Sequence, residues 1–223
     1  MKTCVIIPTY NEAKAIGYVL RQIPKEVTEV VVIDDGSTDA TSLLAQDNGA
    51  VVLRNQKNEG KGASLIKGFD YAISKSFDAV ITMDGDGQHL PQEILFFIQL
   101  ARHSEAAIFI GNRMSDVSGM PWIRIVTNKI MSWFLSKITG QSIPDSQCGF
   151  RLIKRPVLEK IKFRTHRYET ESEILIKAAR LGFKIVSVPI RTIYLRKKSQ
   201  INPFWDTVRF LRFILRELWT TKF

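Results

Sequence analysis

The sequence has few cysteines and few histidines. Cys4 and Cys148 are the two cysteines among its 223 residues, and three residues are histidine. Two cysteines so far apart predict neither a disulfide framework nor a zinc cluster. His89, His103 and His166 are scattered and lack the spacing of a metal site. The small disulfide-rich and zinc-stabilised classes are therefore excluded.

Long apolar runs are also missing. The strongest, Ile94–Leu100, is far shorter than the ~18–20 residues that cross a bilayer. The N-terminal apolar stretch meets Pro8 too early for the core of a secretory signal. We therefore expect a cytoplasmic chain without an anchor or export signal.

The composition fits one large globular domain with an excess of positive charge. Hydrophobic residues make up 45% of the chain, and the formal net charge is +10. Such a charge suits phosphorylated substrates, acidic lipids or nucleic acid. Residues 191–223 alone hold eight basic residues against two acidic ones. Because no nucleic-acid recognition motif accompanies these charges, we expect no nucleic-acid partner.

The first half alternates apolar runs with amphipathic patterns. The predicted strands are 5–7, 30–33, 51–53, 79–83 and 107–111, and the predicted helices between them are 13–23, 39–46, 61–74 and 91–102. Strands that are apolar throughout, separated by single helices, are typical of an α/β fold with a mostly parallel sheet and helices on both faces. Such a sheet carries its site on the loops that leave the carboxyl ends of the strands.

The second half is less regular. It predicts helices over 122–138, 170–181 and 203–219, strands over 185–188 and 191–195, and a connector over 140–149. Because no linker is visible, we expect one domain over 1–223. Its parts are a nucleotide-sugar-binding half (1–113), an acceptor half (114–202) and a C-terminal amphipathic helix (203–223).

The most informative motif is Asp84-Gly85-Asp86-Gly87-Gln88, directly after a predicted strand. Two carboxylates released from a strand end can converge on one hard cation such as Mg²⁺ or Mn²⁺. An Asp-Gly turn without a metal is the alternative.

Three further loops follow predicted strands. Asp34 and Asp35 can accept hydrogen bonds from a base or ribose, although residues 37–39 can equally cap a helix. The loop Pro8–Glu12 offers an aromatic face beside polar groups. Lys61, flanked by glycines at a helix start, favours an anion.

The order and spacing of these motifs resemble family 2 glycosyltransferases with the GT-A fold. Gln88-His89-Leu90-Pro91 and Gly111-Asn112-Arg113 strengthen this resemblance, and Asp145-Ser146-Gln147-Cys148-Gly149-Phe150-Arg151 is very similar to a block of the polyprenyl-phosphate sugar transferases. Those enzymes are the dolichyl-phosphate mannose and glucose synthases and their bacterial relatives.

The resemblance implies inverting, metal-dependent transfer of a hexose from a nucleoside-diphosphate sugar. It assigns the donor to Pro8, Tyr10, Glu12, Ile33, Asp34, Asp35, Asp84 and Gly85. Lys61, which favours an anion by its place at a helix start, is added to the donor site as a helper. It assigns the metal to Asp86 and Gln88, and the phosphates of donor or acceptor to Arg113, Arg124 and Arg196. A hydroxyl acceptor would need a general base, for which Asp145 is our first candidate.

The acceptor stays open at this point. A polyprenyl phosphate is favoured, but many dolichyl-phosphate enzymes carry a transmembrane anchor that we do not find. The Gly and Lys of the family's Arg-x-x-Gly-x-Ser-Lys pattern are also absent from Arg196–Gln200. The alternatives are a soluble enzyme that glycosylates a saccharide or protein hydroxyl, and a non-catalytic nucleotide-sugar or lipid-binding module. The intact Asp84 and Asp86 argue against the module, and the oligomeric state is not indicated.

The last predicted helix has the pattern of an interfacial segment. One face holds Phe204, Val208, Leu211, Ile214, Leu215, Leu218 and Trp219, and its flank holds Arg209, Arg212 and Arg216. A basic, aromatic-bearing amphipathic helix can lie on an anionic membrane surface. The alternative is that its apolar face packs on the domain core. Phe210 and Phe213, which lie off the main stripe, favour the membrane, so we expect peripheral attachment at the cytoplasmic face.

Overall fold

The structure is a computed structural model that describes residues 1–193, 210 and 212–214. In this part of the chain seven strands form one sheet with the order β3-β2-β1-β4-β6-β5-β7. The strands are β1 Thr3–Thr9, β2 Glu29–Asp34, β3 Val51–Arg54, β4 Ala79–Thr82, β5 Ile108–Asn112, β6 Arg151–Lys154 and β7 Ile185–Pro189. Only β6 runs antiparallel to its neighbours, β4 and β5. The predicted α/β fold with a mostly parallel sheet is confirmed.

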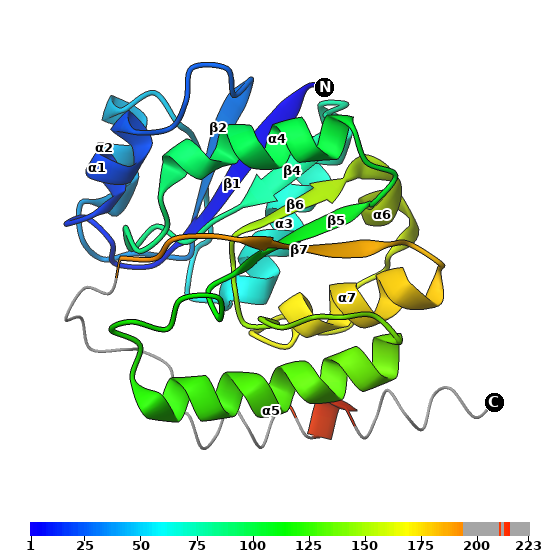
Figure 1. The fold of residues 1–223 in the computed structure, drawn as a ribbon. Helices are drawn as coiled ribbons and strands as arrows, with labels where there is room; N and C mark the ends of the chain where they lie inside the picture. Colours follow the sequence, from blue (N-terminus) through cyan, green and yellow to red (C-terminus); the bar gives the residue numbers. More distant parts are fainter. Residues whose placement is uncertain (194–209, 211, 215–223) are drawn as a thin grey trace.

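Helices cover the sheet on both sides (Figure 1). They are α1 Ile16–Arg21, α2 Thr41–Asp47, α3 Lys61–Ser74, the 3₁₀ turn η1 Pro91–Glu93, α4 Ile94–Arg102, α5 Trp122–Thr139, α6 Arg155–Lys160 and α7 Thr170–Arg180. Figure 1 shows α4 on one side of the sheet and α3 and α7 on the other, with α5 beyond α7. The central strands β1 and β4 are buried along almost their whole length, which is why they are apolar throughout.

Some predicted elements differ from the structure. Strand β6 and helix α6 were not predicted, because β6 has only Leu152 and Ile153 between two basic residues. The predicted strand 191–195 is wrong over 191–193, where only Thr192 forms an isolated bridge, to His89. Its last two residues lie outside the described part.

The topology brings the predicted loops to one edge of the sheet. The carboxyl ends of β1, β2, β4 and β5 point the same way, because these strands are parallel or related through the antiparallel β6. Strand β6 begins at this edge, where Arg151 pairs with Thr82. The loop 145–150 therefore arrives beside the loop that follows β4.

The described residues of the C-terminal segment correct one expectation. Phe210 and Phe213 are helical and buried within the hydrophobic core, so they do not favour a membrane contact. Ile214 is buried as well, whereas Arg212 is exposed. The other residues of the predicted helix 203–219 lie outside the described part. None of the helices described is both long and apolar enough to cross a membrane.

Candidate active site

The acidic loop after β4 packs closely on the end of β1. A Cβ on Gly85 would lie 2.7 Å from Cγ2 of Thr9, so a glycine is needed there. Asp86 accepts a hydrogen bond from the Gln88 backbone N–H at 3.0 Å and another from the Gln88 side-chain amide. Asp84, Asp86 and Gln88 are all partly accessible. The loop therefore presents oxygen ligands to solvent at the edge of the sheet.

Asp84 forms an ion pair that reaches across the site. Lys61 Nζ, at the start of α3, lies 2.7 Å from Asp84 Oδ1 and 3.3 Å from Glu171 Oε1 of α7. Burial by itself would raise the pKa of Asp84, but the charge of Lys61 and its hydrogen bond outweigh burial and hold that pKa well below its usual range. Burial would lower the pKa of Lys61, but Asp84 and Glu171 raise it above its usual value. Both groups are therefore charged at neutral pH.

His89 fixes the backbone of the same loop. Its Nδ1 accepts a hydrogen bond from the Asp84 N–H at 3.3 Å, and its ring packs edge-on against Phe150 with centroids 5.5 Å apart. The side chain is buried, and burial lowers its pKa despite the nearby acids. A neutral imidazole leaves Nδ1 free to accept. No role was predicted for His89, because nothing in the spacing of the sequence indicates its contact with a backbone amide.

Two glycines allow the loops around the ion pair to approach one another. A Cβ on Gly149 would lie 2.9 Å from Asp84 Oδ2 and 3.0 Å from Lys61 Nζ. The Gly149 carbonyl accepts a hydrogen bond from Thr82 Oγ1 at 2.8 Å. On α3, a Cβ on Gly62 would lie 2.1 Å from Thr170 Oγ1. The Asp145–Arg151 block therefore lies directly over the Lys61–Asp84 pair.

Arg113 is held in a fixed orientation by Asp145. Its Nε and NH2 groups donate to the two carboxylate oxygens at 2.7 and 2.9 Å, and its backbone N–H donates at 2.9 Å. Asn128 of α5 donates to the same carboxylate at 2.7 Å. Burial would raise the pKa of Asp145, but the Arg113 hydrogen bonds and charge keep that pKa below its usual value.

This geometry does not suit the general-base role expected for Asp145. Its side chain is inaccessible to solvent, and both its oxygens are occupied by donors from Arg113 and Asn128. A carboxylate with a lowered pKa and no open face cannot collect a proton from an acceptor hydroxyl. Asp145 instead positions Arg113.

The two acids at the end of β2, Asp34 and Asp35, accept hydrogen bonds from neighbouring segments of the protein itself. Asp34 is fully buried and accepts hydrogen bonds from the Ser37 N–H and the Ser42 hydroxyl. Asp35 accepts from Asn55 Nδ2 and from the N–H groups of Glu59 and Gly60, at 2.8–2.9 Å. Asp35 thereby fixes the loop that begins α3 and sets the place of Lys61. The side chain of Ile33 is fully buried in the core, which leaves it no surface for a nucleoside.

The loop after β1 stays partly accessible. Pro8, Tyr10 and Glu12 are half-buried at the edge of the sheet. Hydrogen bonds join this loop to the segment that follows β2. The Asn11 N–H donates to Ser37 Oγ at 2.9 Å, and the Glu12 N–H donates to Thr41 Oγ1 at 2.8 Å. These contacts keep Tyr10 and Glu12 beside the strand ends.

The two remaining arginines are less well placed. Arg124 is half-buried in the first turn of α5, the helix that supplies Asn128. Arg196 lies outside the described residues. The chain nevertheless approaches the acidic loop shortly before it, because Ile193 N–H donates to the Gln88 carbonyl at 2.9 Å.

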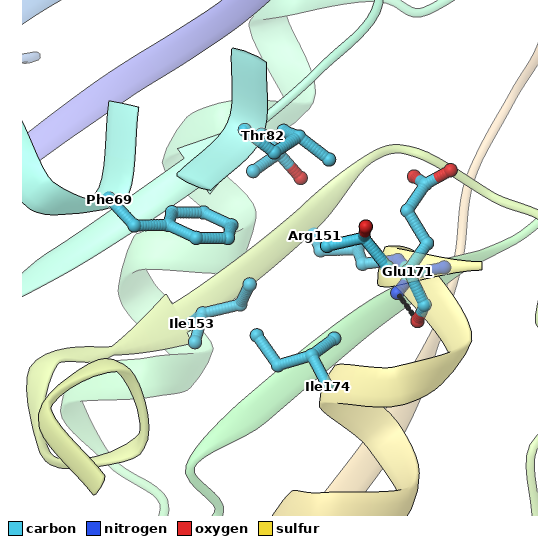
Figure 2. A pocket seen from close by; sticks show the side chains of 8 residues that line it. Phe69, Thr82, Arg151, Ile153, Glu171 and Ile174 are labelled. Atoms are coloured by element: carbon cyan, nitrogen blue, oxygen red, sulfur yellow. Dashed lines mark hydrogen bonds between the residues drawn. The ribbon is translucent and has the colours of Figure 1, made fainter. Parts of the chain in front are cut away.

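A buried arginine lies beneath the site. Arg151 donates to the carbonyls of Ser146 and Cys148 at 2.8 Å and to that of Glu171 at 2.5 Å. Figure 2 shows the Glu171 carboxylate pointing away from Arg151. Arg151 thus ties the loop 145–150 to α7 while the Glu171 carboxylate meets Lys61. The cavity beside it holds about 10 Å³, room for a single water rather than a ligand.

The chain is similar to known proteins over most of its length. Residues 4–162 match the model of glycosyl transferase family 2. The polyprenol monophosphomannose synthase of Mycolicibacterium smegmatis is 31% identical over 203 residues, 85% of this chain and 76% of that protein. A UDP-N-acetylglucosamine–dolichyl-phosphate N-acetylglucosaminyltransferase of Methanococcus voltae is 30% identical over 213 residues, 85% of each chain.

A solved structure shares the fold. Glucosyl-3-phosphoglycerate synthase of Mycobacterium tuberculosis, crystallised with Mn²⁺, UDP and glucosyl-3-phosphoglycerate, superposes with a TM-score of 0.71 at 20% identity. The match covers 98% of this chain and 79% of that one. The same enzyme was also crystallised with Mg²⁺ and UDP. The chain belongs to glycosyl transferase family 2 and is a glycosyltransferase.

Proposed function

We propose that this glycosyltransferase moves a hexose from a nucleoside-diphosphate sugar to a polyprenyl phosphate, with inversion at the anomeric carbon. The observation that carries the proposal is the convergence of Lys61 and Arg113 on the acidic loop at one sheet edge. The charge of Arg113 is close enough to lower the pKa of Asp84. Two cations beside a loop of oxygen ligands suit a substrate with a diphosphate and a phosphate. Relatives named for polyprenol and dolichyl-phosphate acceptors support the same choice.

The donor set of the acidic loop fits a divalent cation. Mg²⁺ and Mn²⁺ bind through one or two carboxylates and complete their shell with substrate phosphates and water. The described residues offer no group of three or more acid, histidine or cysteine side chains for a metal, so an all-protein cage is not available here. Asp86 and Gln88, with Asp84 beside them, would hold the ion. Bound there, it would neutralise charge on the diphosphate leaving group.

The remaining residues would bind and orient the substrates. Tyr10, Pro8 and Glu12 would hold the nucleoside, and Asp35 and Gly85 would shape the bottom of the donor-binding site. Lys61 and Arg113 would stabilise negative charge as the bond from C1 to the diphosphate oxygen breaks. The acceptor phosphate oxygen forms the new bond to C1, and the nucleoside diphosphate leaves. A phosphate oxyanion needs no general base, which agrees with the engagement of Asp145 by Arg113 and Asn128.

A lipid acceptor places the reaction at a membrane surface. We propose peripheral attachment at the cytoplasmic face. A soluble enzyme that glycosylates a hydroxyl is the second candidate. The solved structure with the same fold, glucosyl-3-phosphoglycerate synthase, was crystallised with the water-soluble compound glucosyl-3-phosphoglycerate.

The test is a transfer assay in detergent micelles. Purified protein is given a panel of radiolabelled UDP- and GDP-sugars with Mn²⁺, and either polyprenyl phosphate or a panel of soluble phosphate and hydroxyl acceptors. The proposal predicts label in the lipid phase from one donor. Label only in a soluble product would assign the enzyme to the second candidate, and donor binding without any transfer would leave only a binding module.

A further inference from the structure

Helix α5 exposes large apolar side chains, which is unusual for a helix on the surface of a soluble protein. Its outward side chains include Trp122, Ile123, Val126, Ile130 and Trp133, and these are 73%, 44%, 45%, 51% and 56% exposed. At ~100° per residue they fall on one side of the helix. This set is named the α5 apolar face.

The opposite side of α5 carries polar groups into the protein. Asn128 and Ser132 are buried, where Asn128 donates to Asp145 at 2.7 Å and Ser132 Oγ lies 3.0 Å from Ser146 Oγ. Met131 and Leu135 complete this buried side. An ordinary surface helix buries its apolar stripe and exposes its polar one. Contiguous exposed apolar side chains mark a surface that meets another apolar phase.

The charges on α5 itself are all positive. No acidic residue occurs between Asp116 and Asp145, whereas Arg124, Lys129 and Lys137 lie on the helix. Lys129 and Lys137 are exposed and fall on the same side of the helix as the two tryptophans. Tryptophan with flanking lysine is the combination that settles at the boundary between lipid headgroups and acyl chains.

We propose that the α5 apolar face is a membrane-contact surface that rests on a bilayer with anionic headgroups. This inference deepens the proposed function, because a lipid-phosphate acceptor is anchored in the layer that α5 would contact. The contact is also close to the site: Asn128, on the buried side of α5, shares the Asp145 carboxylate with Arg113. A bilayer against the outer side of α5 would thus lie about one helix diameter, ~10 Å, from the side that meets the arginine expected to bind a phosphate.

The first experiment is vesicle flotation of the full chain. Vesicles of phosphatidylcholine, with or without 30% phosphatidylglycerol (a chosen composition, about one anionic lipid in three), are mixed with wild type and variants. Trp122→Ser with Trp133→Ser should lower the partition coefficient by about tenfold or more. Lys129→Gln with Lys137→Gln should lower it about fivefold per lysine, on anionic vesicles only. The matched control is Tyr18→Ser with Leu43→Ser, two side chains of α1 and α2 that are 58% and 59% exposed and should not change binding.

A fluorescent probe identifies what covers the face. Cys4 and Cys148 are buried, so an environment-sensitive dye can be attached selectively at Ile130→Cys, with Leu43→Cys as the control position. A blue shift of the Ile130→Cys probe on adding anionic vesicles, absent at Leu43→Cys, is expected. A shift that depends on protein concentration without lipid would overturn the proposal in favour of a second copy of the chain. A probe already shielded in dilute protein, and unchanged by vesicles, would overturn it in favour of the chain's own C-terminal residues.

The detergent transfer assay separates this inference from the proposed function. Transfer to polyprenyl phosphate in micelles without vesicle binding would refute the membrane role of α5 alone. Vesicle binding without transfer would refute the acceptor and leave the contact surface standing.

Discussion

Replacing Lys61 with methionine should destabilise the protein in a manner that depends on pH. The substitution keeps an unbranched side chain but removes the cation between Asp84 and Glu171. Removing one partner of a fully buried pair costs about 3–5 kcal/mol. Here the side chains of Lys61, Asp84 and Glu171 are 20%, 33% and 12% exposed, so water screens part of the interaction between their charges. We expect a loss of about 2 kcal/mol at pH 7, or about 4–8 °C in Tm.

The pH dependence follows from the direction of the Asp84 pKa shift. In the wild type this pKa is held below its usual value, so the pair contributes stability above pH ~4 and loses it as the pH falls through the folded-state pKa. In Lys61→Met the same carboxyl has lost its cation, so burial makes it easier to protonate than in the unfolded chain. The difference between the two proteins should therefore begin to shrink above pH ~4, where Asp84 of Lys61→Met takes up a proton, and should shrink further as the pH falls below ~4 and the wild type loses its ion pair.

Urea unfolding of both proteins between pH 7 and pH 3.5 measures this difference. The double variant Lys61→Met with Glu171→Gln removes one of the two uncompensated charges and should recover part of the loss. Equal stability of Lys61→Met and wild type at pH 7, or a deficit that stays constant down to pH 3.5, would refute the reasoning.

Substitutions at Gly62, His89 and Arg113 test separate parts of the site, with Gly17→Ala as the control for the first. Gly62→Ala, whose Cβ would lie 2.4 Å from the Arg167 carbonyl oxygen, should cost about 3 kcal/mol in urea unfolding. The control Gly17→Ala, in α1, places a Cβ near only the ends of flexible side chains and should change stability by less than about 1 kcal/mol. If Gly62→Ala and Gly17→Ala lower stability by similar amounts, α3 can move to accommodate the new methyl group. Burial lowers the pKa of His89, so wild-type stability should decline as the pH falls below ~6.5. His89→Asn keeps an acceptor for the Asp84 N–H and should flatten the Tm profile between pH 7 and pH 5, whereas an unchanged slope would place the titration elsewhere. Arg113→Lys replaces a bidentate fork with a point charge and should lower kcat/KM by about tenfold or more, about 1.4 kcal/mol, and an unchanged value would place Arg113 outside the site.

Periodicity and apolar runs predicted most of the fold. Strands β1 and β4 could be predicted because both faces of each are covered almost throughout, which requires apolar residues at nearly every position. Helix α3 was predicted with its observed bounds. Strand β6 was missed because its outer residues are Arg151 and Lys154, and the burial of Arg151 depends on carbonyls from distant loops. Such contacts leave no periodic signal.

The sequence grouped the candidate site residues better than it assigned roles to them. Carboxylates at strand ends directed attention to one edge of the sheet, where the structure brings their loops together. The partners that fix them, Glu171 on Lys61 and His89 on the Asp84 N–H, come from long-range packing and could not be read from spacing. For the same reason Asp145 resembled a free base, although Arg113 and Asn128 occupy it. The composition of α5 likewise did not reveal which of its sides is buried.

Metal dependence of transfer in wild type and Asp86→Ala tests the central claim most directly. Asp86 is partly accessible and accepts hydrogen bonds from the neighbouring Gln88, so its loss should leave the fold nearly unchanged. The assay measures label transferred from the preferred nucleotide-sugar to polyprenyl phosphate in micelles, after chelation and during titration with Mn²⁺. We predict that chelation abolishes transfer by wild type, that Mn²⁺ restores it, and that Asp86→Ala loses several kcal/mol of transition-state stabilisation at every Mn²⁺ concentration. Near-wild-type turnover of folded Asp86→Ala, or wild-type transfer that survives chelation, would contradict the account.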